Sequence, residues 1–204
     1  MTTDFTHVYE PGTTDWTVVL LHGTGGDEHD LVPLGRQLAP GAALLSPRGQ
    51  VLEGSMPRFF RRLAVGQLDI PDLIERTDEL AAWMRARTAE HGRDPERVVA
   101  AGLSNGANIA VSVLFRHPDL LRGAALLRPM LPYEPDAQPD LSGTDVLIAS
   151  GTQDPFAPLD QVRRLAQILD DGGATVTAHV QEAGHGLTQQ DLVDTATWFA
   201  ALLA

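Results

Sequence analysis

Short apolar runs alternate along this chain with longer segments in which apolar residues recur at helical spacing. Thr17–Leu21 is the clearest run, because it carries no charge and is rich in β-branched side chains, which predicts a buried strand. Over residues 72–90 the apolar positions fall instead on one helix face. This alternation predicts a mostly parallel sheet with helices on both faces, the α/β class. The other expected strands are 42–45, 97–102, Gly123–Leu127, 146–150 and 175–180, and the other expected helices are Asn105–Arg116, 159–169 and 188–203.

The sequence gives no sign of a second domain. Its 204 residues contain no internal repeat, no linker and no break in composition, so residues 1–204 are expected to form one domain. A chain of this length buries about 70% of its unfolded surface, and hydrophobic residues make up 43% of it. No insertion is long enough for a separate cap domain, so a shallow and open cleft is expected.

Charge and composition exclude several classes of protein. The net charge is −12, and the 15 basic residues are all arginines that form no basic run, which argues against nucleic acid or an anionic membrane as a partner. The absence of cysteine excludes disulfides, thiolate metal sites and cysteine nucleophiles. No signal peptide or membrane-spanning stretch is visible, so a soluble, cytoplasmic protein is expected.

The segment GLSNG at residues 102–106 follows one expected strand and opens the next expected helix. Ligands of open parallel sheets bind beyond the carboxyl ends of the strands, which makes this a favourable position for a functional residue. A G-x-S-x-G sequence in this context is typical of a nucleophile elbow, where the glycines allow a tight turn that exposes Ser104. The alternative is a plain glycine-rich turn in which Ser104 only caps the helix.

A second glycine-rich segment, LLHGTGG at residues 20–26, ends the first buried strand. Acyl transfer needs two N–H groups directed at the developing oxyanion, and we assign them to Thr24 and Asn105. A loop of free amides could bind a phosphate instead, but the sequence has neither a G-x-G-x-x-G nor a Walker motif. We interpret His22 as a structural hydrogen-bonding residue under the loop rather than a base.

A candidate carboxylate follows the expected strand 146–150. Asp154 lies in the loop after this strand, where a triad carboxylate can reach a histidine. Its alternative role is to cap the Asp-Pro turn. Asp160 falls within the next expected helix and Asp145 at the other end of the strand, so position favours Asp154.

A candidate base follows the last expected strand. His185 lies between two glycines, and imidazole is suited to proton transfer at neutral pH. A single loop histidine is often only a surface residue, but the other histidines are less well placed. The order Ser104, Asp154, His185, each after a later strand, is that of α/β-hydrolases and favours a catalytic role for all three.

The acidic cluster DEHD at residues 27–30 suggests a metal site as an alternative. Acidic residues are also stabilised near a helix N-terminus, and Asp27 is expected to cap a helix after the loop, with His29 early in that helix. No second group with ligand spacing occurs elsewhere in the sequence. We therefore expect no metal and no cofactor.

Four blocks of the sequence resemble those of the phospholipase/carboxylesterase family, which includes small bacterial carboxylesterases and acyl-protein thioesterases: LLHGTGGDEHDL, AGLSNGANIA, GTQDPFAP and AGHGLTQQDL. The match runs from about Trp16 to the C-terminus. One further stretch, from SPRGQV to PRFFRR, resembles the hydroquinone-inducible bacterial carboxylesterases in particular. The resemblance implies an α/β-hydrolase fold and, because members are often homodimers, a homodimer.

The resemblance also assigns roles to individual residues. Those that it places in the triad and the oxyanion hole are Ser104, Asp154, His185, Thr24 and Asn105. One departure matters, since acyl-protein thioesterases typically carry Gln where this chain has Asn105. This difference favours the small-ester branch over a protein-deacylating enzyme.

Two loops, 46–60 and 128–143, are expected to wall the cleft. The apolar candidates for an acyl or alcohol pocket are Phe59, Phe60, Met130 and Leu131. Ordinary core packing is the alternative for all of them. Arg48 or Arg58 could bind a substrate carboxylate, with a salt bridge as the alternative in so acidic a chain.

Together these features predict a serine carboxylesterase that hydrolyses small, short-chain or aromatic esters through an acyl-enzyme, without a cofactor. A thioesterase or lysophospholipase that uses the same groups is one alternative. A non-catalytic ligand-binding protein on a hydrolase fold is another, because a fold does not by itself give a function.

Overall fold

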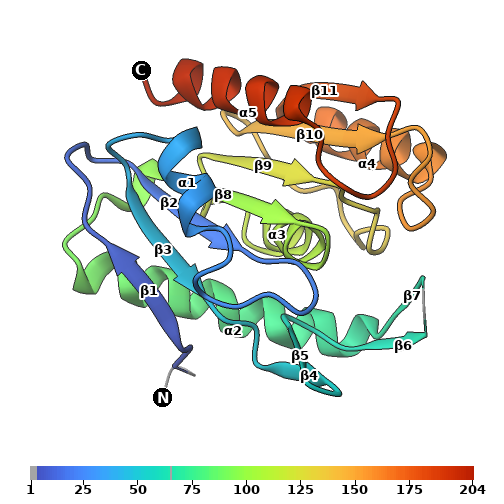
Figure 1. Cartoon of the computed structure of the whole chain (residues 1–204), viewed down its shortest axis with the longest axis horizontal. Coiled ribbons are helices and arrows are strands. Elements are labelled where there is room, and N and C mark those ends of the chain that lie inside the picture. The colour runs from blue at the N-terminus through green and yellow to red at the C-terminus, as the bar shows by residue number, and fades with distance from the viewer. Residues whose placement is uncertain (1–3, 65) are drawn as a thin grey trace.

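The computed structural model describes residues 4–64 and 66–204. In this part of the chain a seven-stranded sheet lies between two layers of helices (Figure 1). The strand order is β1-β3-β2-β8-β9-β10-β11, and within this sheet β1 and β3 are antiparallel while the other neighbours are parallel. The prediction of a mostly parallel sheet with helices on both faces is confirmed. Its strands are β1 (His7–Glu10), β2 (Thr17–Leu21), β3 (Ala43–Pro47), β8 (Val98–Leu103), β9 (Gly123–Leu127), β10 (Asp145–Gly151) and β11 (Thr175–Gln181).

Both faces of the sheet are buried, as strand β2 illustrates. Val18 and Leu20 pack into one apolar cluster, while Val19 and Leu21 point the opposite way and pack into the other. The cluster around Val19 is covered by α2 (Ile70–Glu90), α3 (Asn105–Arg116) and α4 (Leu159–Asp171), and the cluster around Val18 by α1 (Val32–Leu38) and α5 (Gln189–Leu202). This two-sided burial explains why the inner strands β2, β8, β9 and β10 are largely apolar rather than alternating, unlike the edge strands β1 and β11.

The elements predicted from the sequence lie close to the observed ones. β2, α3 and β9 have the expected bounds, and the others differ by one or two residues. Helix α2 begins at Ile70, earlier than expected, because the Asp69 side chain accepts a hydrogen bond from the Asp72 N–H at 3.2 Å. Pro71 suits the first turn of this helix, where its missing N–H leaves no unpaired acceptor.

Two small hairpins that were not predicted from the sequence follow β3. β4 (Val51–Glu53) pairs with β5 (Met56–Arg58), and β6 (Arg62–Ala64) pairs with β7 (Gln67–Leu68). Strands this short carry too little periodicity to be recognised, and the edge strand β1 was missed for the same reason. The β6–β7 hairpin lies on the side toward which the β8, β9 and β10 arrows point (Figure 1).

The helix after the glycine-rich loop differs from the prediction. It begins only at Val32, and its N-cap residue Leu31 makes no side-chain cap hydrogen bond. The expected capping of this helix by Asp27 is wrong, and His29 lies before the helix rather than in its first turn. The Asp27 carboxylate accepts a hydrogen bond from the His29 N–H at 2.8 Å and so stabilises a local turn.

A short 3-10 turn, η1 (Pro95–Arg97), leads into β8. In the two described ranges no helix is both long and apolar enough to cross a membrane.

Candidate active site

Ser104 lies in the sharp turn between β8 and α3, with φ 52° and ψ −110°. Residues other than glycine rarely adopt a positive φ, and such strain persists only where the surroundings enforce it. Here the Ser104 N–H donates to the Leu127 carbonyl at 2.8 Å, and the Ser104 carbonyl accepts from the Asn108 N–H at 2.9 Å. The turn therefore holds the serine hydroxyl at the carboxyl end of the sheet, where it lines a cavity.

The two glycines that flank Ser104 are required by close backbone packing. A Cβ on Gly106 would lie 1.9 Å from the Leu21 carbonyl oxygen of β2, and a Cβ on Gly102 would lie 2.5 Å from the Gly106 carbonyl oxygen. Neither position has room for a side chain. The G-x-S-x-G sequence thus follows from the packing of β8, α3 and β2 around one turn.

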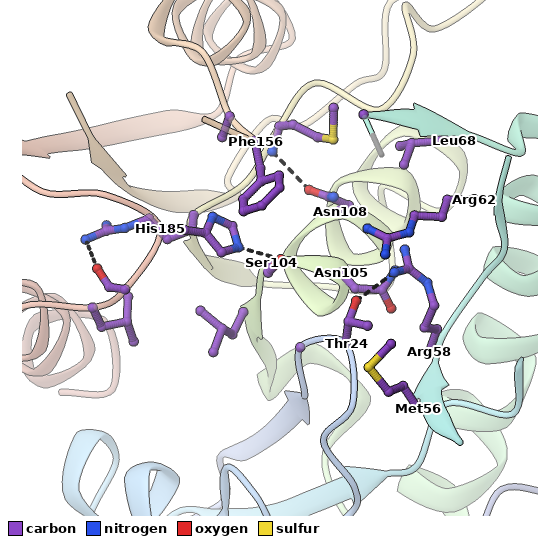
Figure 2. A pocket seen from close by; sticks show the side chains of 18 residues that line it. Thr24, Met56, Arg58, Arg62, Leu68, Ser104, Asn105, Asn108, Phe156 and His185 are labelled. Carbon is purple, nitrogen blue, oxygen red and sulfur yellow. Dashed lines mark hydrogen bonds between the residues drawn. The ribbon is translucent and has the colours of Figure 1, made fainter. Parts of the chain in front are cut away.

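Three of the residues singled out from the sequence form a chain of hydrogen bonds, of which Figure 2 shows the contact between His185 and Ser104. His185 Nε2 lies 2.8 Å from Ser104 Oγ, and His185 Nδ1 lies 2.8 Å from Asp154 Oδ2. The serine follows β8, the carboxylate follows β10 and the histidine follows β11. Parallel neighbours end on the same side of a sheet, which brings these distant loops together.

The Asp154 carboxylate is buried and its orientation is fixed. Its Oδ1 accepts hydrogen bonds from the N–H groups of Phe156 at 2.9 Å and Ala157 at 3.3 Å, which leaves Oδ2 facing His185. The Phe156 ring meets the His185 ring edge-on, with centroids 5.0 Å apart. Asp154 therefore also caps the turn, which was its alternative role. The hydrogen bonds that cap the turn are the ones that orient the carboxylate toward the imidazole.

The glycine-rich loop after β2 and the start of α3 border the same cavity. The hydrogen bonds found in the described part of the chain use neither the Thr24 N–H nor the Asn105 N–H as a donor. The loop is held on each side of Thr24, because the Gly25 N–H donates to the Pro57 carbonyl at 2.9 Å and the Gly26 N–H to the Gly23 carbonyl at 3.1 Å. Two amides are thus free beside Ser104.

His22 lies beneath this loop and acts as a structural residue. Its Nε2 accepts a hydrogen bond from the Gly49 N–H at 2.9 Å, so its proton is on Nδ1, which donates to the Gly23 carbonyl at 2.7 Å. Burial lowers the pKa of His22, which favours the neutral ring that this pattern requires. The geometry agrees with the interpretation of His22 as a support for the loop.

A cavity of about 430 Å³ opens beside Ser104, within the range of small-molecule sites. Two asparagines one turn apart on α3 fasten its walls. The Asn105 side-chain oxygen accepts from the Phe59 N–H at 2.8 Å, and that of Asn108 accepts from the Met130 N–H at 2.9 Å. Apolar side chains that line the cavity are Met56, Leu68, Leu103, Met130, Phe156, Ala157 and Leu187.

Of the apolar residues expected to line the pocket, only Met130 does so among the described residues. The prediction for Phe59 and Phe60 is wrong, because both side chains are buried in the core. Leu131 packs against the same core and is not part of the lining. The alternative of ordinary core packing is therefore correct for these three residues. The sequence does not indicate whether an aromatic side chain in a loop beside the cleft points into the cavity or into the core.

The arginines considered as carboxylate ligands both form ion pairs. Arg48 donates to Glu28, with one N–O distance of 2.8 Å, and lies outside the cavity lining. Arg58 does line the cavity, where it donates to the Thr24 hydroxyl at 2.8 Å and to Glu53 at 3.1 Å. Arg62 shares the same carboxylate at 2.6 Å. Two guanidinium groups and one carboxylate leave this wall with a net positive charge.

This charged wall perturbs the groups within it. Burial, followed by the nearby Arg62 charge, lowers the pKa of Arg58. The hydrogen bond from Arg62 is the main cause that lowers the pKa of Glu53, and burial opposes it. The lowered pKa of Glu53 favours its carboxylate form at neutral pH, where an arginine guanidinium is protonated in any case.

Several residues of the site were missed from the sequence. Phe156 and Asn108 lie close in sequence to Asp154 and Ser104, and this closeness to the recognised motifs could have indicated that they belong to the site. Arg62 and Leu68 lie on hairpins that were not predicted. Arg128 is a single charge directly after the apolar strand β9, and a charge at that end of a strand is a usable signal.

The acidic cluster at residues 27–30 has protein partners rather than the layout of a metal site. Glu28 pairs with Arg48, and Asp27 with the His29 N–H. Across residues 4–64 and 66–204, no three His, Cys, Asp or Glu side chains gather closely enough to hold a metal ion.

A mostly parallel sheet with a strained serine at a strand–helix turn, and with an aspartate and a histidine on later loops, defines an α/β-hydrolase. A model of the dienelactone hydrolase family matches residues 62–197, a range that contains all three. The chain is also 45% identical over 193 residues to the putative hydrolase MhqD of Bacillus subtilis (strain 168), covering 95% of this chain and 96% of that protein. It therefore belongs to the dienelactone hydrolase family, a carboxylesterase-type family of α/β-hydrolases.

Solved structures agree with this assignment. A crystal structure of a Bacillus cereus carboxylesterase is 42% identical with a TM-score of 0.94, covering 97% of this chain and 94% of that one. A structure of YahD with malic acid is 27% identical with a TM-score of 0.92, covering 98% of this chain and 100% of that one. The resemblance stated from the sequence blocks is confirmed, and the protein is a hydrolase of the dienelactone hydrolase/carboxylesterase type.

Proposed function

We propose that this hydrolase is a serine carboxylesterase that cleaves small carboxylic esters through an acyl-enzyme. The observation that carries the proposal is the unbroken hydrogen-bond chain from Ser104 Oγ through His185 to Asp154, with both contacts at 2.8 Å. A serine hydroxyl is a weak nucleophile until an adjacent base accepts its proton. His185 is within reach of that proton, and Asp154 holds the imidazole in the tautomer that can accept it.

The reaction proceeds in two halves. His185 Nε2 takes the Ser104 proton as Oγ attacks the ester carbonyl, and then gives that proton to the departing alcohol. Water, deprotonated by the same imidazole, attacks the acyl-Ser104 ester and releases the acid. The Thr24 and Asn105 N–H groups stabilise the oxyanion in both halves, an effect worth roughly 3 kcal/mol per donor. No step needs a metal or a cofactor.

The cavity supports short acyl chains or small aromatic groups. A volume of about 430 Å³ accommodates a compact ester, and its apolar lining can bury part of one. Met130 and Phe156 both line the cavity, so an acyl or alcohol moiety bound there would contact their side chains. A long lipid chain would extend beyond this space.

The charge of the hairpin wall supports a preference among small esters. Arg58 and Arg62 share Glu53, and the remaining positive charge borders the cavity. An ester with an anionic group therefore gains an attraction that a neutral one lacks. The similar protein YahD was solved with malic acid, a dicarboxylate, which fits this preference.

The experiment that tests the function is hydrolysis of p-nitrophenyl esters with acyl chains from C2 to C12, by the wild type and by Ser104→Ala. We expect activity that is highest for short chains and absent in the variant. Equal rates for both proteins would overturn the proposal.

Two alternatives are separated by parallel measurements. A thioesterase or lysophospholipase would use the same groups, so matched oxygen and sulfur esters and a lysophospholipid should be compared directly. A non-catalytic ligand-binding protein would leave Ser104 unreactive toward a fluorophosphonate probe.

A further inference from the structure

We propose that Arg128 is a positioning residue that holds His185 in place for the reaction. This inference rests on the proposed function, in which His185 is the base. Arg128 follows β9 and is fully buried, with its side chain 0% exposed. It is not part of the hydrogen-bond chain from Ser104 to Asp154, and its effect would pass through the loop that carries His185.

The guanidinium of Arg128 binds the histidine loop on both sides of His185. Its Nε donates to the Gly184 carbonyl at 3.2 Å, and its Nη2 donates to the Gly186 carbonyl at 2.9 Å. Among the described residues no other donor reaches either carbonyl. One rigid, planar group therefore fixes the two peptide units that flank the imidazole.

The loop needs such an external support. Gly184 and Gly186 have no side chains, so each can adopt many backbone conformations. The preceding residue is already fixed, because the Ala183 carbonyl accepts from the Gln153 N–H at 2.9 Å. Beyond Ala183, the contacts with Arg128 are what restrict the backbone around the histidine.

Asp191 holds the Arg128 guanidinium in place. Its carboxylate pairs with Arg128 through contacts of 3.2 and 2.6 Å, and its side chain is also 0% exposed. The same carboxylate accepts from the Thr188 N–H at 2.7 Å in the capping box that begins α5. The loop is thus fastened to β9 at one point and to the start of α5 at another.

The backbone and the burial both indicate a role beyond stability. Arg128 has φ 56°, a strained conformation for a residue with a side chain, and its N–H donates to the Ala149 carbonyl at 2.8 Å. Burying an ion pair removes two charges from water, so such pairs are weak evidence for stabilisation. Strain and a buried charge next to a reacting group point instead to preorganisation.

The fork geometry makes the expected effect specific to arginine. The four contacts of Arg128 come from three nitrogen atoms in one plane, and lysine has a single nitrogen that cannot reproduce them. In Arg128→Lys, the charge opposite Asp191 is kept while the carbonyl contacts are lost. We expect kcat for p-nitrophenyl acetate to fall about 10- to 100-fold, with KM changed less than about twofold. The base is misplaced in this variant, whereas the Arg128 side chain borders the cavity but is 0% exposed and so offers no surface to a substrate.

A second variant removes the pair without leaving a buried charge. In Arg128→Met/Asp191→Asn both charges disappear, and Asn can still accept from the Thr188 N–H, so the fold should persist. The matched control is Arg122→Met at the opposite end of β9, where Arg122 likewise pairs with an aspartate, Asp145, and donates to a glycine carbonyl. We expect wild-type kcat for this control.

Hydrogen exchange distinguishes a local effect on the histidine loop from a general loss of stability. In both Arg128 variants, peptides covering residues 184–188 should exchange faster, while those covering Ser104 and Asp154 should keep wild-type rates. Wild-type kcat together with unchanged exchange in the folded variants would overturn the inference, as would uniform loosening of the whole chain. Failure of the proposed function looks different, since Ser104→Ala would then hydrolyse esters like the wild type.

Discussion

The loops after β8, β10 and β11 and the two hairpins β4–β5 and β6–β7 border the same cavity but are built differently. On the loops, backbone geometry and buried contacts set the position of each group. Ser104 is strained into place, and Asp154 is held by two amides. On the hairpins, strands of two or three residues carry the partly exposed ion pair of Arg62 and Glu53, and Leu52 and Leu63 are exposed.

This difference indicates a division of labour. Groups whose placement depends on packed backbone have little freedom to change, which suits the bond-breaking steps. Side chains that rest on surface ion pairs contribute little stability and are easily replaced, which suits the selection of a substrate. Substitutions on the loops should therefore remove turnover, and substitutions on the hairpins should change preference.

The largest effect is expected for Asp154→Asn. The amide cannot hold His185 in the tautomer that accepts the serine proton, so kcat should fall by up to about four orders of magnitude. The fold should persist, because Asn can still accept from the Phe156 N–H. Steady-state kinetics with p-nitrophenyl acetate measure the effect, and a loss of less than tenfold would show that another carboxylate orients the histidine.

The next effect is expected for Gly106→Ala, which tests whether backbone packing sets the elbow. The new Cβ would meet the Leu21 carbonyl at 1.9 Å, so the turn must open. We expect the free energy of unfolding to fall by about 3 kcal/mol and kcat by about 100-fold, measured by urea unfolding and by kinetics.

The control for this substitution is Gly143→Ala, at the other end of the sheet. That glycine has φ 82°, but an added Cβ meets nothing within 4 Å. Strain without a clash should lower stability by about 1 kcal/mol and leave kcat at the wild-type value. Equal kinetics for the two glycine variants would contradict the packing argument.

A smaller effect is expected for Asn105→Ala, which joins the two regions. The backbone N–H at position 105 remains, but the Phe59 N–H loses its acceptor and the hairpin side of the cavity loosens. Stability should fall by about 1–2 kcal/mol and KM should rise about fivefold, with kcat nearly unchanged. A loss confined to kcat would mean that the side chain acts on the reaction itself.

The smallest effect is expected for Arg62→Gln on the hairpin wall. Removing one charge near the surface should raise KM about fivefold for an ester with a carboxylate and leave a neutral ester of the same size unaffected. The control is Arg164→Gln, which removes an exposed ion pair with Glu134 away from the cavity. It should leave KM unchanged for both esters. Equal changes for the charged and the neutral ester would contradict the proposed selectivity.

The same comparison explains what could be predicted from the sequence. The strands before Ser104 and Asp154 are largely apolar, while β11 before His185 mixes apolar and polar residues, and the loops after all three contain glycine or proline next to a polar residue. Such patterns follow directly from a parallel sheet with ligands at its carboxyl ends. Fold class and the grouping of the three residues were therefore accessible.

The cavity walls were not accessible in this way. Hairpins of two or three residues per strand lack periodicity, and the direction of Phe59 and Phe60 depends on the hairpin register. The contacts of Arg128 depend on a carboxylate 63 positions away, a pairing that no local pattern encodes. Long-range side-chain contacts and short irregular strands are thus what the sequence analysis could not supply.

The most direct test is to identify the residue that a fluorophosphonate labels in the folded protein. Trypsin cuts after arginine, so Ser104 lies in the peptide 98–116 together with Ser112, and fragmentation separates the two. The Ser112 hydroxyl is buried and hydrogen-bonded to the hydroxyls of Thr77 and Tyr133, so we expect it to be unreactive. We expect one label, on Ser104, that is absent in Ser104→Ala and forms far more slowly in His185→Ala. A folded wild type that stays unlabelled, or one labelled at another residue, would contradict it.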